Sequence, residues 1–201
     1  MKVLLATRNE GKKHEYADLM SGLGIEWLTL GDLGVDLDVE ETGTTFEENA
    51  LLKARGYAAE TGLLTLADDS GLVVDALDGA PGVYSARYGG EAAPDDRART
   101  RLLLRNMESV SDDQRTARFR CVIAIASPDG RAETASGACE GCITRAPVGE
   151  NGFGYDPVFF VPQRGCTMAQ LPAEIKNQIS HRAQAAMPAR AILARWLAEI
   201  V

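Results

Sequence analysis

The chain has 201 residues, of which 45% are hydrophobic and 25% charged, and its net charge is −8 because 29 Asp and Glu outnumber 21 Lys and Arg. This length and composition indicate a globular protein with a substantial core. The acidic balance argues against a nucleic-acid polymer as partner, since affinity for such a polymer depends on basic surface. No apolar run reaches the roughly 18 residues that cross a membrane, and no signal peptide precedes Arg8, so we expect a cytoplasmic protein without membrane contact.

The first predicted strand, residues 3–6, leads into a polar loop that contains Gly11 and Lys12, and a helical pattern follows. Backbone N–H groups at the start of such a helix can hold a phosphate. The loop lacks the Gly-x-x-x-x-Gly-Lys-Ser/Thr spacing of a Walker A motif. The same pattern is also typical of an ordinary polar turn between a strand and a helix.

An acidic segment that includes Glu40 precedes a predicted helix that ends at Gly62. The start of this helix fits a capping box with either Thr44 or Thr45 as its N-cap. Lys53 lies off the buried stripe of the helix, which favours a solvated side chain that points away from the core.

Two adjacent carboxylates are the most conspicuous polar feature of the chain. The apolar run 63–67 predicts a buried strand that ends at Asp68, Asp69, Ser70 and Gly71. In α/β proteins, ligands bind beyond the carboxyl ends of strands. Two carboxylates at that position repel each other unless a cation or a shared proton offsets their charge. The alternative is a hairpin turn, because Asp, Ser and Gly all favour turns.

The middle of the chain is predicted to contain a long loop, a helix and a hairpin. Residues 79–90 form a loop rich in Gly and Pro, and loops of this length are often functional. A helix is predicted over residues 94–106. Residues 118–126 and 131–143 predict a β-hairpin, which we expect to project from the main sheet towards a second lobe. A short buried strand is predicted at residues 158–161.

A loop between residues 147 and 156 places glycines around Phe153 and Tyr155. This arrangement fits a site where backbone and aromatic ring approach a flat ligand. Aromatic residues that simply pack the loop are the alternative.

The last part of the sequence is predicted to be helical over residues 168–179 and again to residue 200. Pro188 predicts a kink or a restart near Met187. His181 lies at the boundary between the helices, beside a hydroxyl and a guanidinium, and is the better functional candidate of the two histidines.

Carboxylates with scattered Lys and Arg are the groups required for metal-assisted chemistry on a polyphosphate. Mg²⁺ binds one or two carboxylates together with phosphate oxygens of the substrate. Lys and Arg neutralise charge on the leaving group, and an aspartate can take a proton from an attacking water. The aromatic loop would then hold a base.

Over essentially its whole length, the chain resembles the inosine triphosphate pyrophosphatase family, the non-canonical purine NTP pyrophosphatases (XTP/dITP diphosphatases). The family's motifs occur in order: Thr7-Arg8-Asn9-Glu10-Gly11-Lys12, Glu40-Glu41-Thr42-Gly43, Thr45-Phe46-Glu47-Glu48-Asn49-Ala50, Ala67-Asp68-Asp69-Ser70-Gly71-Leu72, Gly79-Ala80-Pro81-Gly82-Val83-Tyr84-Ser85-Ala86-Arg87, Gly152-Phe153-Gly154-Tyr155-Asp156-Pro157 and Ile179-Ser180-His181-Arg182.

The resemblance implies hydrolysis of ITP, dITP and XTP between the α and β phosphates, which gives a nucleoside monophosphate and pyrophosphate. It implies Asp69 as general base and Glu40 with Asp69 as the Mg²⁺ ligands, with Glu41 and Asp68 as nearby alternatives. The implied substrate-binding residues near the phosphates are Thr7, Arg8, Asn9, Glu10, Gly11, Lys12, Lys53 and Ser70. Those of the nucleoside pocket are Phe153, Gly154, Tyr155, Asp156, Lys176, His181 and Arg182.

The fold implied by the resemblance is α/β: an elongated mixed β-sheet flanked by helices, in two lobes with the active-site cleft between them. Residues 1–201 would form one such two-lobed domain, and the family is usually homodimeric. Two positions depart from the family pattern. Ile175 stands where relatives often carry an acidic residue, and Pro188 interrupts a helix that is usually continuous.

Base choice has a physical rationale. Hypoxanthine and xanthine present a 6-keto acceptor, whereas adenine presents a 6-amino donor. If His181 and Arg182 donate hydrogen bonds, adenine leaves these donors unpaired, which can discriminate by a factor of about 10⁴. Guanine shares the 6-keto group, so its exclusion depends on its 2-amino group.

Two other functions are compatible with parts of this pattern. A nucleotide-binding sensor without catalysis would not need Glu40 and Asp69 together. A house-cleaning pyrophosphatase for modified pyrimidine nucleotides should lack Ser180-His181-Arg182.

Overall fold

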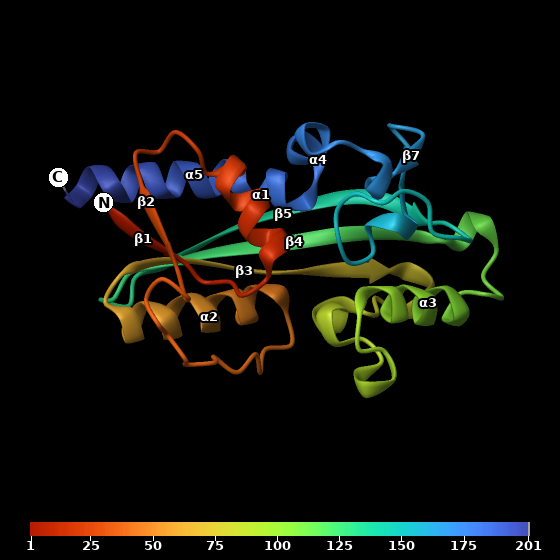
Figure 1. Ribbon diagram of the computed structural model, residues 1–201, viewed down its shortest axis with the longest axis horizontal. Helices are drawn as coiled ribbons and strands as arrows, with labels where there is room; N and C mark the ends of the chain where they lie inside the picture. The colour runs from red at the N-terminus through yellow and green to blue at the C-terminus, as the bar shows by residue number, and fades with distance from the viewer. Residues whose placement is uncertain (201) are drawn as a thin grey trace. The chain divides into compact units, whose positions relative to one another are not determined.

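The computed structural model describes residues 1–200 and has a mixed α/β fold (Figure 1). Within these residues the strands form one sheet in the order β2-β1-β3-β4-β5-β6-β7. The strands are β1 (Lys2–Leu5), β2 (Glu26–Thr29), β3 (Leu64–Val74), β4 (Thr116–Ala126), β5 (Ala132–Ile143), β6 (Phe159–Val161) and β7 (Cys166–Thr167). The α-helices are α1 (Glu10–Leu19), α2 (Phe46–Thr61), α3 (Asp96–Asn106), α4 (Ala173–Ile179) and α5 (His181–Ile200). None of these helices is both long and apolar enough to cross a membrane.

The chain divides into two compact units. The first consists of residues 1–69, 121–137 and 182 onward, and the second of residues 70–120 and 138–181. The long strands β3, β4 and β5 each supply residues to both units.

In the first unit, β1 pairs in parallel with β2 and with β3. Helices α1 and α5 lie on one side of these strands and α2 lies on the other (Figure 1). A buried cluster joins Tyr16 of α1 and Leu193 of α5 to Leu66 of β3 and Ile123 of β4. The strand face that carries Leu66 is therefore the face packed against α1 and α5.

In the second unit, β6 pairs antiparallel with β5 and with β7. Figure 1 shows α3 below the strands and α4 with β7 above them. Leu103 of α3, Phe119 of β4 and Phe159 of β6 belong to one buried cluster. Short 3₁₀ turns occupy much of the long loop after β3.

Several local predictions are confirmed. The first strand is followed by a helix, and β4 and β5 are neighbours joined by a turn at residues 127–131. The capping box of α2 uses Thr45, whose Oγ1 accepts a hydrogen bond from the N–H of Glu48 at 3.1 Å. Gly62 ends α2 with a φ of 66°, in the left-handed region that favours glycine.

The predicted strand end at Asp68 is wrong, and so is the alternative hairpin turn. β3 runs without a break through Asp68, Asp69, Ser70 and Gly71. Pairing within the sheet outweighs the local turn preference of these residues. Gly71 allows a close approach in the extended strand, because a Cβ there would overlap the hydroxyl of Ser85.

Of the kink or restart predicted near Met187, the restart is wrong, because α5 continues as one helix with Pro188 inside it, while the kink stays a prediction. A proline removes the hydrogen bond to the carbonyl four residues earlier, here that of Gln184. Gln184 and Pro188 are both exposed, so water can satisfy this carbonyl.

Candidate functional site

Asp68 and Asp69 are both buried, and they face opposite sides of the sheet. Side chains alternate along a strand, so Asp68 shares the face of Leu66, which packs against α1 and α5. Asp69 points to the other face, where α2 lies (Figure 1). Each carboxylate therefore has its own set of neighbouring side chains.

The contacts of the Asp68 carboxylate are all made by one of its two oxygens, Oδ2. Lys12 Nζ lies 2.9 Å from Asp68 Oδ2, Arg182 Nε lies 3.6 Å from it, and Cys121 Sγ lies 3.8 Å from it. The second oxygen, Oδ1, is buried and makes no hydrogen bond with any residue in the described part of the chain. A buried carboxylate oxygen of this kind is suited to bind a ligand.

The strand register explains how Lys12 reaches Asp68. β1 ends at Leu5, which pairs with Leu66, and the N–H of Ala6 donates to the carbonyl of Leu66 at 2.8 Å. β3 continues beyond this point, while the chain after β1 turns into α1. The first turn of α1 therefore lies beside Asp68.

Cations keep Asp68 ionised. Burial alone would raise the pKa of Asp68, but the charges of Lys12, Arg182 and Lys53 outweigh it, so the pKa lies well below the usual range of Asp. Burial raises the pKa of the neighbouring Cys121 thiol to about 12, and the charge of Asp68 acts in the same direction.

Arg182 is buried between two carboxylates. Its Nη1 forms an ion pair with Glu15, and its guanidinium carbon lies 5.8 Å from the centre of the Tyr16 ring. Neither Glu15 nor Tyr16 was recognised as a site residue from the sequence. The available signal was spacing, because Glu15 follows Lys12 by three residues and therefore lies on the same face of α1.

Two residues one turn apart on α2 hold Asp69. Asn49 Nδ2 donates to Asp69 Oδ2 at 3.2 Å, and Lys53 Nζ lies 3.4 Å from Asp69 Oδ1. Lys53 Nζ also lies 3.0 Å from Glu41 Oε1. The prediction that Lys53 is solvated is wrong, since its side chain is 13% exposed. Its charge is balanced by the two carboxylates that it contacts.

The pKa of Asp69 is raised, in contrast to that of Asp68. Burial is the largest cause, and the charges of Glu41 and Asp68 add to it, while Lys53 and Lys12 oppose it. The two adjacent aspartates therefore differ in basicity, and Asp69 is the one better suited to take up a proton.

Gly43 fixes the amide of Asn49. The N–H of Gly43 donates to Asn49 Oδ1 at 2.8 Å, which leaves the amide nitrogen directed at Asp69. A Cβ on Gly43 would lie 2.7 Å from Asn49 Oδ1 and 2.6 Å from Glu48 Cβ. Sequence analysis quoted Asn49 within a motif without assigning it a role. It is identified by its burial on α2, where the other buried residues are all apolar or aromatic.

The site contains carboxylates of the kind that bind Mg²⁺, but Glu40 and Glu41 are placed differently within it. Glu40 is exposed, and it is Glu41 that contacts Lys53. Residues 1–200 contain no cluster of three His, Cys, Asp or Glu side chains arranged to hold a metal. Mg²⁺ needs fewer, since it usually binds one or two carboxylates with phosphate oxygens and water. Asp68 Oδ1 and the Asp69 carboxylate are oxygen donors of the required kind.

The other residues of the N-terminal motif shape the loop before α1. Asn9 is the N-cap, and its Oδ1 accepts from the N–H of Lys12 at 3.1 Å. Thr7 Oγ1 accepts from the N–H of Asn9 at 3.2 Å. Arg8 donates to two carbonyls of the segment 35–37 at 3.0 Å each. Glu10, the first residue of α1, pairs with a lysine of the same turn.

In the second unit, a buried ion pair holds the aromatic loop. Lys176 Nζ lies 2.5 Å from Asp156 Oδ2, and the same oxygen accepts from the N–H of Phe153 at 3.0 Å. Lys176 Nζ also lies 4.7 Å from the centre of the Phe153 ring. Gly152 has a φ of 74°, and a Cβ there would overlap the Asp156 carboxylate.

Helix α3 holds the same loop from another direction. The N–H of Gly154 donates to Asp96 Oδ2 at 2.9 Å, and its carbonyl accepts from Thr100 Oγ1 at 3.4 Å. The hydroxyl of Tyr155 donates to the carbonyl of Ser85 at 2.9 Å. Tyr155 is thus a packed residue, whereas Phe153 is half-buried.

His181 lies in the second unit, stacked on Phe119 with ring centres 4.8 Å apart. It is buried, as is Ser180 before it. Ser70, the residue after Asp69 in β3, is half-buried. The structure thus groups the predicted site residues in three sets. The first is Lys12 with Asp68 and Arg182, and the second is Lys53 with Asp69. The third is Phe153 with Asp156 and Lys176. Arg182, predicted for the nucleoside pocket, lies beside Asp68.

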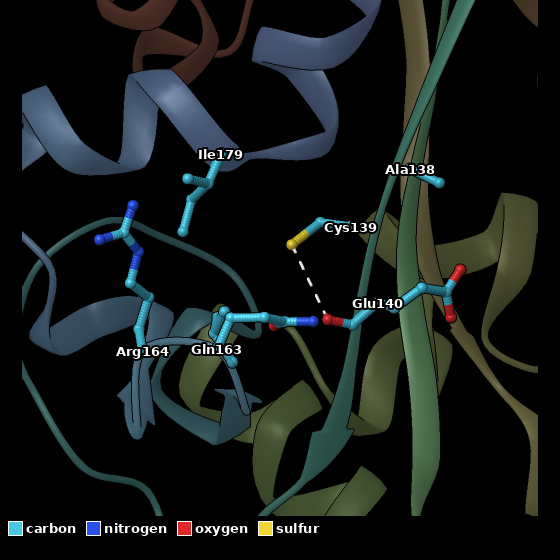
Figure 2. A pocket seen from close by; sticks show the side chains of 7 residues that line it. Ala138, Cys139, Glu140, Gln163, Arg164 and Ile179 are labelled. Atoms are coloured by element: carbon cyan, nitrogen blue, oxygen red, sulfur yellow. Dashed lines mark hydrogen bonds between the residues drawn. The ribbon is translucent and has the colours of Figure 1, made fainter.

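A cavity of about 360 Å³ in the second unit lies apart from these residues. Figure 2 shows Cys139 of β5 and Ile179 of α4 on its walls, with Gln163 and Arg164 at its lower side. Its lining includes none of the predicted site residues.

Comparison with known proteins gives consistent matches. The family model described as the Ham1 family matches residues 3–191. The dITP/XTP pyrophosphatase of Desulforamulus reducens is 54% identical over 195 residues, which are 97% of this chain and 96% of that protein. The dITP/XTP pyrophosphatase of Geobacter sulfurreducens is 55% identical over 92% of each chain. The structure of a HAM1 protein from Coxiella burnetii has a TM-score of 0.88 at 43% identity and covers 97% of this chain and 99% of its own.

Proposed function

The chain belongs to the Ham1 family, and we propose on this basis that it hydrolyses non-canonical purine nucleoside triphosphates such as dITP and XTP to the monophosphate and pyrophosphate. The family resemblance expected from the motifs, and the α/β fold, are thereby confirmed. A homodimer and a cytoplasmic location stay predictions from the sequence.

The observation that carries the proposal is the pair of buried aspartates with pKa values moved in opposite directions. Such pairs allow one carboxylate to stay ionised while the other exchanges a proton. Asp69 is the general base in this proposal, because burial raises its pKa, whereas at Asp68 the charges of Lys12, Arg182 and Lys53 outweigh burial and lower the pKa. Asn49 and Lys53 orient its carboxylate towards an attacking water.

Lys12 and Lys53 would neutralise phosphate charge, since each already contacts an aspartate and both are largely buried. Mg²⁺ would be held by Asp69 and Glu40, with Asp68 Oδ1 and Glu41 as further oxygen donors. When bound, the ion would polarise phosphoryl oxygens and offset their charge.

The loop around Phe153 is proposed to hold the purine. Asp156 and Lys176 fix the backbone at Phe153, so the ring is presented in one orientation. His181 would donate a hydrogen bond to the 6-keto oxygen of inosine and xanthine nucleotides. Adenine offers a donor at that position and would leave this group unpaired.

The test is pyrophosphate release from dITP, ITP, XTP, ATP and GTP with Mg²⁺, for the wild type and Asp69→Asn. We expect fast release from the first three substrates, slow release from ATP and GTP, and loss of release in Asp69→Asn. Equal turnover of all five would contradict the account of the base pocket. Tight dITP binding without pyrophosphate would favour the nucleotide sensor.

A further inference from the structure

Four buried or largely buried charges of alternating sign are arranged in a chain within the first unit: Glu15, Arg182, Asp68 and Lys12. Arg182 is the largest fully buried side chain of the protein's described residues. A buried guanidinium must be balanced, because removing one partner of a buried ion pair leaves an uncompensated charge. Here the carboxylates of Glu15 and Asp68 together balance the charge of Arg182.

The two carboxylates hold Arg182 unequally. Glu15 is in close contact with Nη1, whereas Asp68 Oδ2 lies 3.6 Å from Nε, beyond hydrogen-bond distance. An arginine that is free to turn would form a bidentate pair with one carboxylate, with two parallel N–H···O bonds. The contact with Glu15 keeps Nη1 away from Asp68 and prevents this arrangement.

We propose that Glu15 is a positioning residue that restrains Arg182. The guanidinium then offsets the charge of Asp68 without forming a bidentate pair with its carboxylate. The consequence lies at Asp68 Oδ1, which stays without a hydrogen bond among the described residues. This inference rests on the proposed pyrophosphatase function, in which Asp68 is part of the reacting site.

The variant Glu15→Gln keeps the size of the side chain and removes its charge. One of the two carboxylates that face Arg182 is then lost, and the guanidinium closes on Asp68. Glu15 itself is not among the residues proposed to contact the substrate, so we expect kcat for dITP to fall by about tenfold to a hundredfold with KM within about twofold, the range seen when a reacting group is misplaced. Asp18→Asn, on an exposed position of the same helix, is the matched control and should keep the wild-type kcat.

A double-mutant cycle separates positioning from general stability. If Glu15 acts through Arg182, adding Arg182→Gln to Glu15→Gln costs much less than Arg182→Gln costs alone. Thermal midpoints of the metal-free variants accompany the rates, so that a folding defect is seen directly. Should Glu15→Gln fail to fold, Glu15→Asp tests the inference instead. This variant keeps the charge on a side chain that is shorter by one methylene, and we expect an intermediate kcat with unchanged KM.

Wild-type kcat in a folded Glu15→Gln or Glu15→Asp protein, or additive losses in the cycle, would overturn the inference. Failure of the proposed function is distinguishable, because the wild-type protein itself would then release no pyrophosphate from dITP.

Discussion

The carboxylates of Asp68 and Asp69 belong to consecutive residues, yet they lie on opposite faces of β3. Asp68 is held on the face of α1 and α5 by Lys12 and Arg182, and Asp69 on the face of α2 by Asn49 and Lys53. The charges on the two faces still act on each other, since Lys53 lowers the pKa of Asp68 and Asp68 raises that of Asp69. The pKa of Asp68 is thus lowered and the pKa of Asp69 raised, although the two residues are adjacent in the chain.

This arrangement predicts opposite effects on stability for two similar substitutions. Asp68→Asn leaves Lys12 and Arg182 buried with less compensating charge and should lower the free energy of unfolding by about 3 kcal/mol. Asp69→Asn removes a carboxylate whose burial disfavours its charge, so stability should be unchanged or increased while hydrolysis is lost. Urea unfolding of both variants at neutral pH measures the difference. A larger loss of stability in Asp69→Asn than in Asp68→Asn would contradict the assignment of a lowered pKa to Asp68 and a raised pKa to Asp69.

The aromatic loop gives a prediction about two glycines of similar backbone conformation. Gly152→Ala places a Cβ against Asp156, and also 3.1 Å from Lys176 Nζ, so the ion pair that holds Phe153 must shift. Gly154→Ala points into open space and carries only the strain of a positive φ, about 1 kcal/mol. Steady-state kinetics on dITP should show a KM increase of about tenfold or more for Gly152→Ala and a smaller one for Gly154→Ala. Equal effects would show that the Asp156–Lys176 pair does not set the affinity.

Local sequence signals located most elements of the fold. The capping box at Thr45, the left-handed Gly62 and the alternating apolar pattern of the hairpin each depend on neighbouring residues alone. The order of the motifs then identified the family, because each motif keeps its place in the chain.

The site required information that local patterns do not carry. Turn preferences suggested that β3 stops at Asp68, whereas sheet pairing extends the strand, and the extension is what directs Asp69 to the other face. Lys53 looked solvated because its negative partners, Asp69 and Glu41, come from other segments. For the same reason the pairing of Glu15 with the distant Arg182 could not be read from the helix pattern.

The cysteines provide a test of burial around the site. Cys121 is fully buried and its thiol pKa is raised to about 12, and burial likewise raises the pKa of Cys139 to about 11. The thiolate is the reactive form, so both should resist iodoacetamide at pH 8 in the native protein. Cys142 and Cys166, which are both half-buried, should react before Cys121 and Cys139. Mass spectrometry of labelled peptides, with urea-unfolded protein as the control, checks this order; early labelling of Cys121 would contradict the packing around Asp68.

An ion-pair network in the second unit predicts how stability depends on pH. Hydrogen bonds from Arg118 and Thr116 hold the pKa of Asp75 below its usual value of 3.8. A carboxyl group with a depressed folded-state pKa stabilises the protein above the unfolded pKa, and the contribution is lost as pH falls through the folded value. Asp75→Asn should therefore unfold at lower urea than the wild type at pH 7, with a gap that narrows below pH 3.8. The Asp75 side chain is 42% exposed, so we expect a small gap that salt reduces further. Asp113→Asn, at an exposed position, is the control, and a gap that stays constant from pH 7 to pH 3 would show that the charge of Asp75 contributes nothing.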